Sequence, residues 1–80
     1  MIFMEKQLIW VTDAKYVDGY RISVTFNDDL KKIIDLKAHL CGKIFEPLKD
    51  IENFKKFSVS GWSVAWKNGA DMAPEFLYRL

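Results

Sequence analysis

A strict alternation of apolar and polar side chains between Tyr20 and Phe26 is the feature that most restricts the fold of this chain. The apolar members of the run are Tyr20, Ile22, Val24 and Phe26. Side chains of a strand point alternately to the two faces of a sheet, so the run predicts a strand with one buried and one polar face. An antiparallel sheet that is covered on one side provides this environment.

The run before this strand, from Leu8 to Tyr16, also alternates, and the turn between the two strands decides which of its faces is buried. A two-residue turn would bring charged side chains into the apolar layer, whereas a three-residue loop over Val17 to Gly19 would not. The longer loop pairs Tyr16 with Tyr20, Ala14 with Ile22, Thr12 with Val24 and Trp10 with Phe26. We therefore expect a left-handed Gly19, with Ile9 and Val11 on the outer face.

Further along the chain, the polar residues 27–29 predict a second turn, and Leu30 to Leu36 predicts a third strand with Ile34 and Leu36 in the core. Between Leu36 and Phe54 the apolar residues recur at steps of three and four, interrupted by glycine and proline. This spacing indicates short helical turns rather than one long helix.

A second hairpin is predicted over residues 57–66, with Ser60-Gly61 as a two-residue turn that sets Val59 opposite Trp62 and Phe57 opposite Val64. We therefore expect an α+β fold. It is a small antiparallel sheet of about five strands, built from a three-stranded meander, a short helical segment and a hairpin, with a short C-terminal helix. One domain is expected to span residues 1–80.

The chain closes with a turn and a helix start. Asn68-Gly69 is a common pair for a tight turn with positive φ, and Pro74 is tolerated only in the first turn of a helix. A helix is expected to begin between residues 72 and 74. Asp71 and Glu75, four residues apart, can act as a catalytic pair of acids on one helix face, but capping of free N–H groups explains both, and we favour capping.

The pattern W-x-N-G-x-D-x-x-P-E-x-L-Y, between Trp66 and Tyr78, resembles the C-terminal signature of a bacterial family of small proteins called domain of unknown function 2442. The resemblance extends over nearly the whole chain, from about Ile9 to Tyr78. It implies a compact α+β fold with no established activity. Members are often encoded beside another small protein or fused to a helix-turn-helix segment, which suggests a regulatory role or one half of a toxin–antitoxin-like pair.

Composition argues against some classes of function. Twelve basic and eleven acidic residues give a net charge of +1, so no overall field attracts nucleic acid or an anionic membrane. No apolar run approaches the roughly 20 residues of a membrane span, and we expect no signal peptide, because Glu5 and Lys6 interrupt the apolar start. The single Cys41 has no disulfide partner within the chain, and a cytoplasmic location is expected.

Few residues are candidates for chemistry. His39 and Cys41 lie two apart, but a metal site needs three or four ligands and no second His/Cys pair completes one. Nothing places a base beside Cys41, so an inert thiol is the simpler interpretation. We find no phosphate loop, serine elbow or histidine-based triad. We therefore expect no metal, no cofactor, no known small-molecule ligand and no enzymatic activity.

Two binding functions remain. A stacking platform for single-stranded nucleic acid requires exposed rings beside lysines, and the alternation places most rings in the core. The rings are Trp10, Tyr16, Tyr20, Trp62, Trp66 and Tyr78, and the lysines are Lys31, Lys32, Lys55, Lys56 and Lys67. We favour contact with a protein partner or a second copy, and keep a nucleic-acid-binding accessory as the alternative. The candidate interaction surface comprises Ile9, Val11, Asn68, Asp71 and Tyr78.

Overall fold

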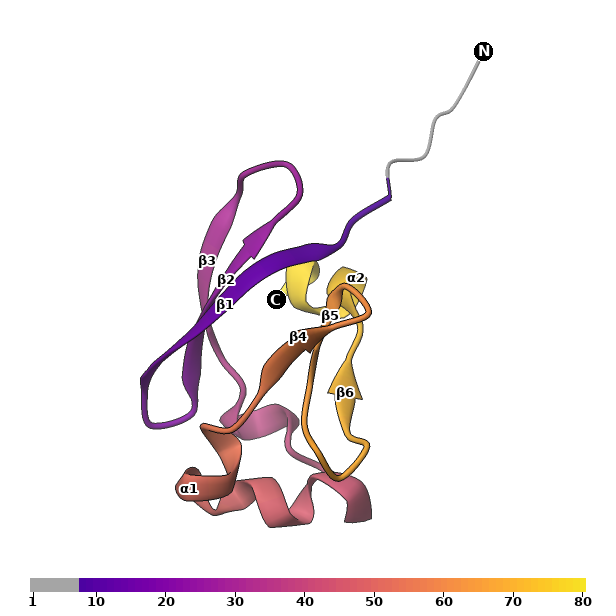
Figure 1. Cartoon of the computed structure of the whole chain (residues 1–80). Helices are drawn as coiled ribbons and strands as arrows, with labels where there is room; N and C mark the ends of the chain where they lie inside the picture. Colours follow the sequence, from indigo (N-terminus) through magenta and orange to yellow (C-terminus); the bar gives the residue numbers. More distant parts are fainter. Residues whose placement is uncertain (1–7) are drawn as a thin grey trace.

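The computed structural model describes residues 8–80, which form two small antiparallel sheets and several short helices (Figure 1). The first sheet has the order β1-β2-β3, with β1 (Val11–Asp18), β2 (Arg21–Phe26) and β3 (Lys31–Asp35). The second has the order β4-β5-β6, with β4 (Ser58–Ser60), β5 (Ser63–Ala65) and β6 (Asp71–Met72). The α+β class is confirmed, but the single sheet of about five strands is wrong, because the second hairpin joins β6 in a sheet of its own.

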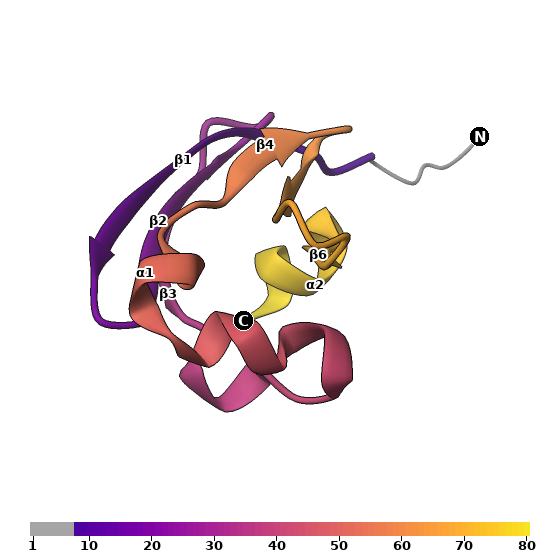
Figure 2. The same cartoon turned by 60° about the horizontal axis from the view of Figure 1, so that its bottom comes forward.

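The segment between the sheets consists of short helical turns, as the sequence predicts. These are η2 (Lys37–His39), η3 (Lys43–Lys49) and α1 (Ile51–Phe54), and a final helix α2 (Pro74–Arg79) ends the chain. Asp50 caps α1, since its side chain accepts a hydrogen bond from the Glu52 N–H at 3.0 Å. In Figure 2 the first sheet lies on one side of the domain, and β6 and α2 lie on the other. No described helix is long and apolar enough to cross a membrane.

Between Asp13 and Phe26 the first hairpin keeps the predicted faces but not the predicted register. Tyr16 lies opposite Ile22 and Ala14 opposite Val24, so the expected pairing is wrong by two residues. The chain turns at residues 19–20, and a register shift between Tyr16 and Asp18 marks a bulge. Gly19 has a φ of +47°, which confirms its left-handed conformation. A shift of two residues leaves the inward face unchanged, because side chains in a strand alternate with a period of two.

A second irregularity at the start of β1 reverses the expected orientation of Val11. The register shifts between Val11 and Asp13, so that Val11 lies opposite Phe26 and its side chain is only 1% exposed. The expectation that Val11 faces outward is therefore wrong. Ile9 is half-buried and packs against the core. One extra residue in a strand moves every side chain beyond it to the other face, and strict alternation cannot reveal it.

The second hairpin also differs by two residues from the predicted pairing. Val59 lies opposite Val64 and Ser60 opposite Ser63, so the turn is formed by Gly61 and Trp62. Both turn residues have positive φ, +59° for the glycine and +69° for the tryptophan. Positive φ at both central positions is the pattern of a type I′ turn, whose twist suits a hairpin.

The C-terminal segment from Trp66 to Arg79 folds as a turn, a short strand and a helix. The turn at Asn68-Gly69 is confirmed, with a φ of +93° at the glycine. Asp71 then pairs with Ala65 in β6, a strand that the sequence analysis missed. Helix α2 begins at Pro74, and its N-cap residue, Ala73, makes no side-chain cap hydrogen bond. Capping by Asp71 is therefore wrong.

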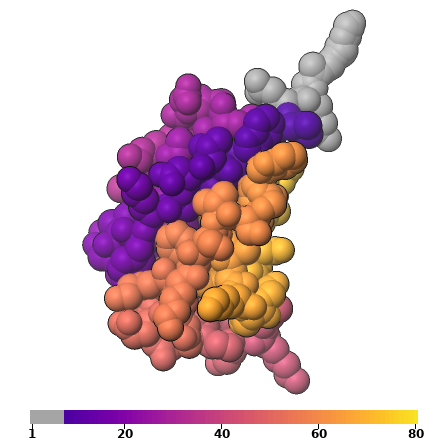
Figure 3. Space-filling view, viewed as in Figure 1, coloured from indigo at the N-terminus to yellow at the C-terminus, as the bar shows by residue number. Residues whose placement is uncertain are grey.

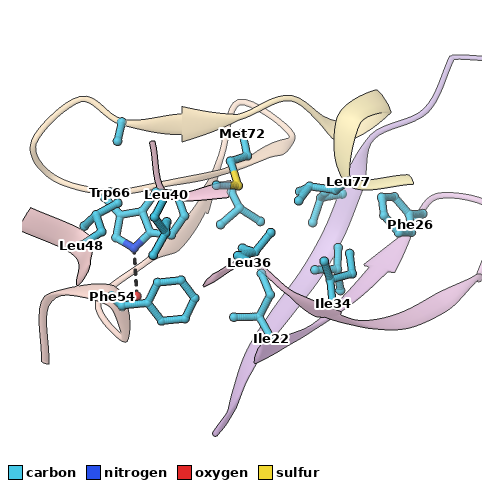
Figure 4. Close-up of a cluster of buried hydrophobic side chains, with 14 residues drawn as sticks. Ile22, Phe26, Ile34, Leu36, Leu40, Leu48, Phe54, Trp66, Met72 and Leu77 are labelled. Atoms are coloured by element: carbon cyan, nitrogen blue, oxygen red, sulfur yellow. Dashed lines mark hydrogen bonds between the residues drawn. The ribbon is translucent and has the colours of Figure 1, made fainter. Parts of the chain in front are cut away.

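The core of the described residues is entirely apolar (Figure 4). Its buried members are Val11, Ile22, Val24, Phe26, Ile34, Leu36, Leu40, Leu48, Phe54, Val64, Trp66, Ala70, Met72 and Leu77. Phe54 lies at the centre of an aromatic cluster, with ring centroids of Tyr20 at 5.4 Å, Trp66 at 5.9 Å and Tyr16 at 6.3 Å. The helical segment therefore contributes to the core that the two sheets share.

Candidate functional site

Trp66, the first residue of the signature, has a structural role. Its side chain is 5% exposed, and the indole Nε1–H donates a hydrogen bond of 2.9 Å to the carbonyl oxygen of Phe54 (Figure 4). A buried indole normally finds such a partner, and here it also satisfies a carbonyl at the end of α1. Trp66 therefore fixes the second sheet against the helical segment, and its ring is unavailable to nucleic acid.

Asn68 joins the turn after β5 to helix η3. Its Nδ2 donates to the carbonyl oxygen of Ile44 at 2.8 Å, and its Oδ1 accepts from the Ala70 N–H at 3.1 Å. The second bond is the local contact by which asparagine favours turns, whereas the first spans distant parts of the chain. The amide is thus engaged at both ends within the fold.

A pocket of about 290 Å³ lies beside these two residues. Its walls include Trp66, Lys67 and Asn68 of the signature, together with Leu48, Asn53 and Lys56. The Asn53 amide donates to the Pro47 carbonyl oxygen at 3.0 Å, and the amide of Asn68 is also engaged. The volume is at the small end of the roughly 300–1,000 Å³ that ligand sites occupy. Two exposed lysines on a small open pocket do not define a ligand.

Tyr78 fastens helix α2 to the turn between β2 and β3. Its hydroxyl donates to Asp28 Oδ2 at 2.6 Å, and the Lys32 ammonium donates to the main-chain oxygens of Tyr78 at 2.7 Å and Leu80 at 2.6 Å. The Tyr78 hydroxyl, and then the Leu30 N–H, hold the pKa of Asp28 below its usual value. The same carboxylate raises the pKa of Tyr78. Both shifts favour the tyrosine hydroxyl as donor and the aspartate as acceptor.

The five residues expected to form one interaction surface do not do so. Val11 is buried, Asp71 is exposed in β6, and Ile9 is half-buried. Asn68 contacts η3, whereas Tyr78 contacts the β2–β3 turn at the other end of the domain (Figure 1). The structure therefore separates the members of the expected surface.

A different residue, Trp62, is the most exposed aromatic side chain among those that the structure describes. Its side chain is 68% exposed, although its backbone occupies the left-handed region that a residue with a Cβ rarely adopts. Its ring centroid lies 5.8 Å from that of Trp10, and its carbonyl oxygen accepts a hydrogen bond of 2.8 Å from the Val11 N–H. That bond links the two sheets. Leu8, 73% exposed, precedes Trp10 in the same stretch.

We call Trp62, Trp10 and Leu8 the Trp62 patch. In Figure 3 the start of β1, in indigo, adjoins the β4–β5 segment, in orange, on one continuous face. The Asn27 side chain supports this stretch, since its Oδ1 accepts from the Trp10 N–H and its Nδ2 donates to the Leu8 carbonyl, both at 3.0 Å. The sequence predicts a strand at Trp62, and an exposed patch is therefore not expected there.

The residues considered for metal or nucleophilic chemistry lie apart from the patch. His39 is half-buried, with its ring 5.3 Å from that of Phe76. Cys41 is exposed, and its Sγ lies 3.6 Å from the Ala38 carbonyl oxygen. Across residues 8–80, no group of three or more His, Cys, Asp or Glu side chains is placed to hold a metal ion.

Comparison with known proteins gives a family and no further relative. No curated protein matches the chain, and no solved structure matches it. One family model does, over residues 11–80, and its description is "Protein of unknown function (DUF2442)". Since the match covers all of the chain beyond its first ten residues, this protein belongs to the DUF2442 family.

Proposed function

We propose that this protein is an interaction module that binds another protein through the Trp62 patch. The observation that carries the proposal is the combination of exposure and backbone conformation at Trp62. A left-handed backbone costs a residue with a Cβ roughly 1–2 kcal/mol, which glycine at this turn position would avoid. The exposed ring contributes little burial within the domain to offset that cost. Burial against a partner would supply the missing stabilisation.

The chemistry of the patch favours a protein with an apolar groove. Tryptophan is enriched among the residues that dominate binding energy when they insert into a desolvated pocket. Among the residues that the structure describes, the groups that adjoin Trp62 in its turn or support Trp10 are uncharged, namely Ser60, Ser63 and Asn27. Single-stranded nucleic acid would instead need lysines close to the rings to follow its backbone. A nucleic-acid-binding accessory is therefore the second candidate.

The proposed activity is binding without catalysis. Among residues 8–80, the two pairs of titratable groups with shifted pKa values are Asp18 with Arg21 and Asp28 with Tyr78, and both lie at the surface rather than in a cleft. In a narrower form of the proposal, the partner is the other half of a two-protein pair. We would then expect a single partner protein that binds with a fixed stoichiometry.

The test compares the wild type with Trp62→Gly in affinity purification from lysates of the cells in which the protein naturally occurs. Glycine removes the ring but accepts the positive φ, so thermal stability should be retained or increased. We expect one protein to copurify with the wild type and to fall at least tenfold with the variant. Ile44→Thr, which removes an exposed apolar side chain on η3, is the matched control and should retain that protein.

Measurements on the purified complex then distinguish a protein partner from a nucleic-acid partner. Acrylamide should quench the tryptophan fluorescence of the protein less in the complex than in the free state, because binding buries Trp62, the most exposed tryptophan that the structure describes. A partner retained equally by the wild type and Trp62→Gly would refute the role of the patch. Salt-sensitive binding of a single-stranded oligonucleotide that is lost with Trp62→Gly would instead establish the accessory function.

A further inference from the structure

Strand β3 is an unpaired edge of the first sheet. The order β1-β2-β3 places it at the margin, and no strand among residues 8–80 pairs with its outer side. The opposite margin differs, because β1 lies against β4 and β5 and its Val11 N–H is bonded to Trp62. An open edge of five residues carries free main-chain donors and acceptors for another strand.

The main-chain hydrogen bonds between β2 and β3 show which N–H and C=O groups of β3 point away from β2. The Phe26 N–H donates to the Leu30 oxygen and the Leu36 N–H to the Tyr20 oxygen, each at 2.9 Å. In an antiparallel pair the bonded positions alternate, so the even-numbered residues of β3 point their N–H and C=O groups at β2. The groups of the odd-numbered residues, Lys31, Ile33 and Asp35, therefore point away from the sheet.

The same three residues have exposed side chains on the outer face of the sheet. Ile33 is 61% exposed, and Lys31 and Asp35 are exposed on either side of it. One oxygen of Asp35 accepts the Lys37 N–H at 3.0 Å, which leaves the other for a further partner. Lys32 belongs to the inner face, where its ammonium group is engaged by the end of α2.

We propose that β3 pairs with β3 of a second copy, antiparallel, with Ile33 opposite its own counterpart. This register sets Lys31 of each copy opposite Asp35 of the other, so the two-fold axis yields two ion pairs around an apolar centre. It also matches the outward N–H and C=O groups of all three positions. Moving the second strand by two residues either way breaks both ion pairs. The first sheets of the two copies would then form one continuous six-stranded sheet.

The self-complementary order of charges favours a second copy over an unrelated strand. Lysine, isoleucine and aspartate at alternate positions are complementary to their own reverse, which an arbitrary partner need not match. An edge of five residues buries less than the roughly 1,200 Å² of a stable complex, so the dimer belongs to the weak class. The inference is independent of the Trp62 patch, which adjoins β1 at the other margin.

Charge exchange tests the register. Lys31→Glu places two acids opposite one another and Asp35→Lys places two bases, so each variant alone should weaken dimerisation at least tenfold in sedimentation equilibrium. An equimolar mixture of the two should restore the dimer, because every facing pair is then of opposite charge. Lys15→Glu, on the exposed side of β1, makes the same change in net charge as Lys31→Glu and should not weaken the dimer.

Two further measurements protect the test against misfolding. Ile33→Pro removes an outward N–H and no bond to β2, so it should abolish the dimer while far-UV circular dichroism stays unchanged. Amide exchange at Lys31, Ile33 and Asp35 should slow as the wild-type concentration rises. A wild type that remains monomeric at about 1 mM, or a dimer unaffected by both Lys31→Glu and Ile33→Pro, would overturn the proposal.

Discussion

Replacing Trp66 by phenylalanine removes the indole that connects the second sheet to the end of α1. The Phe54 carbonyl oxygen loses its 2.9 Å partner in a buried position, which costs about 1–3 kcal/mol. The smaller ring also buries about two fewer carbon-sized groups, at roughly 0.8 kcal/mol each. Together these terms predict a loss of about 2.5–4.5 kcal/mol in the free energy of unfolding.

That loss is large for this domain. Stability of roughly 0.05–0.15 kcal/mol per residue gives an 80-residue chain about 4–12 kcal/mol in total. A domain of this size loses about 4–8 °C in melting temperature per kcal/mol, so Trp66→Phe should lower the midpoint by at least about 10 °C. Urea titration followed by far-UV circular dichroism measures the change without depending on tryptophan fluorescence.

The matched control is Trp62→Phe, the same exchange four residues earlier on a side chain that is 68% exposed. Phenylalanine keeps a Cβ at the positive φ, so the control should change stability by no more than about 0.5 kcal/mol. The Trp66 indole N–H should also exchange with D₂O far more slowly than that of Trp62. Equal losses in the two variants would refute the structural role assigned to Trp66.

Three further changes probe the signature. Asn68→Ala should cost about 1–2 kcal/mol through its two lost hydrogen bonds, whereas Lys67→Ala beside it should be nearly neutral in the same urea assay. Gly69→Ala should cost about 1 kcal/mol or more from backbone strain at a φ of +93°, measured by thermal melting. The pKa of Asp28 is lowered by Tyr78, so this contribution is present at neutral pH and disappears as pH falls below about 4. Tyr78→Phe should therefore lose less stability between about pH 7 and pH 3 than the wild type, measured by urea unfolding.

The parts of the fold that the sequence predicts are those that depend on periodicity. The β2 alternation places Ile22, Val24 and Phe26 in the core, and the steps of three and four after Leu36 become η2, η3 and α1. The first hairpin keeps its predicted inner face at Ala14 and Tyr16 for the same reason. Val11 and Trp62 depart from their predicted faces, at a bulge and at a turn. Periodicity identifies a face but not a register, because a shift of two residues leaves the buried set unchanged.

The registers were wrong because of the position that glycine takes in each turn. We expected glycine to be the last loop residue, and in both hairpins it is the first of two turn residues, followed by Tyr20 or Trp62. Bulky residues are uncommon at the second position of a type I′ turn, so the pair Gly61-Trp62 argues locally for a strand at the tryptophan. A local preference that the fold overrides is a reason to examine the site for function.

The candidate site was only partly predictable. Resemblance identified the family, and local turn chemistry explained Asn68, but the exposure of Trp62 depends on a turn position that the sequence does not specify. Val11 was misplaced because the bulge beside it has no glycine or other local signal. Surfaces depend on registers and bulges, so they are harder to infer from sequence than the core.

The two proposed surfaces lie at opposite margins of the first sheet, which gives their combination a specific consequence. The Trp62 patch adjoins β1, and the dimer edge is β3, with β2 between them. Pairing through β3 would therefore leave both patches free and present two of them on one rigid sheet. A second binding event then occurs at a high effective concentration, so a weak dimer would strengthen attachment to a clustered or dimeric partner without any new contact. Lys31→Glu should remove this gain while leaving the affinity of each single patch unchanged, whereas Trp62→Gly should remove both.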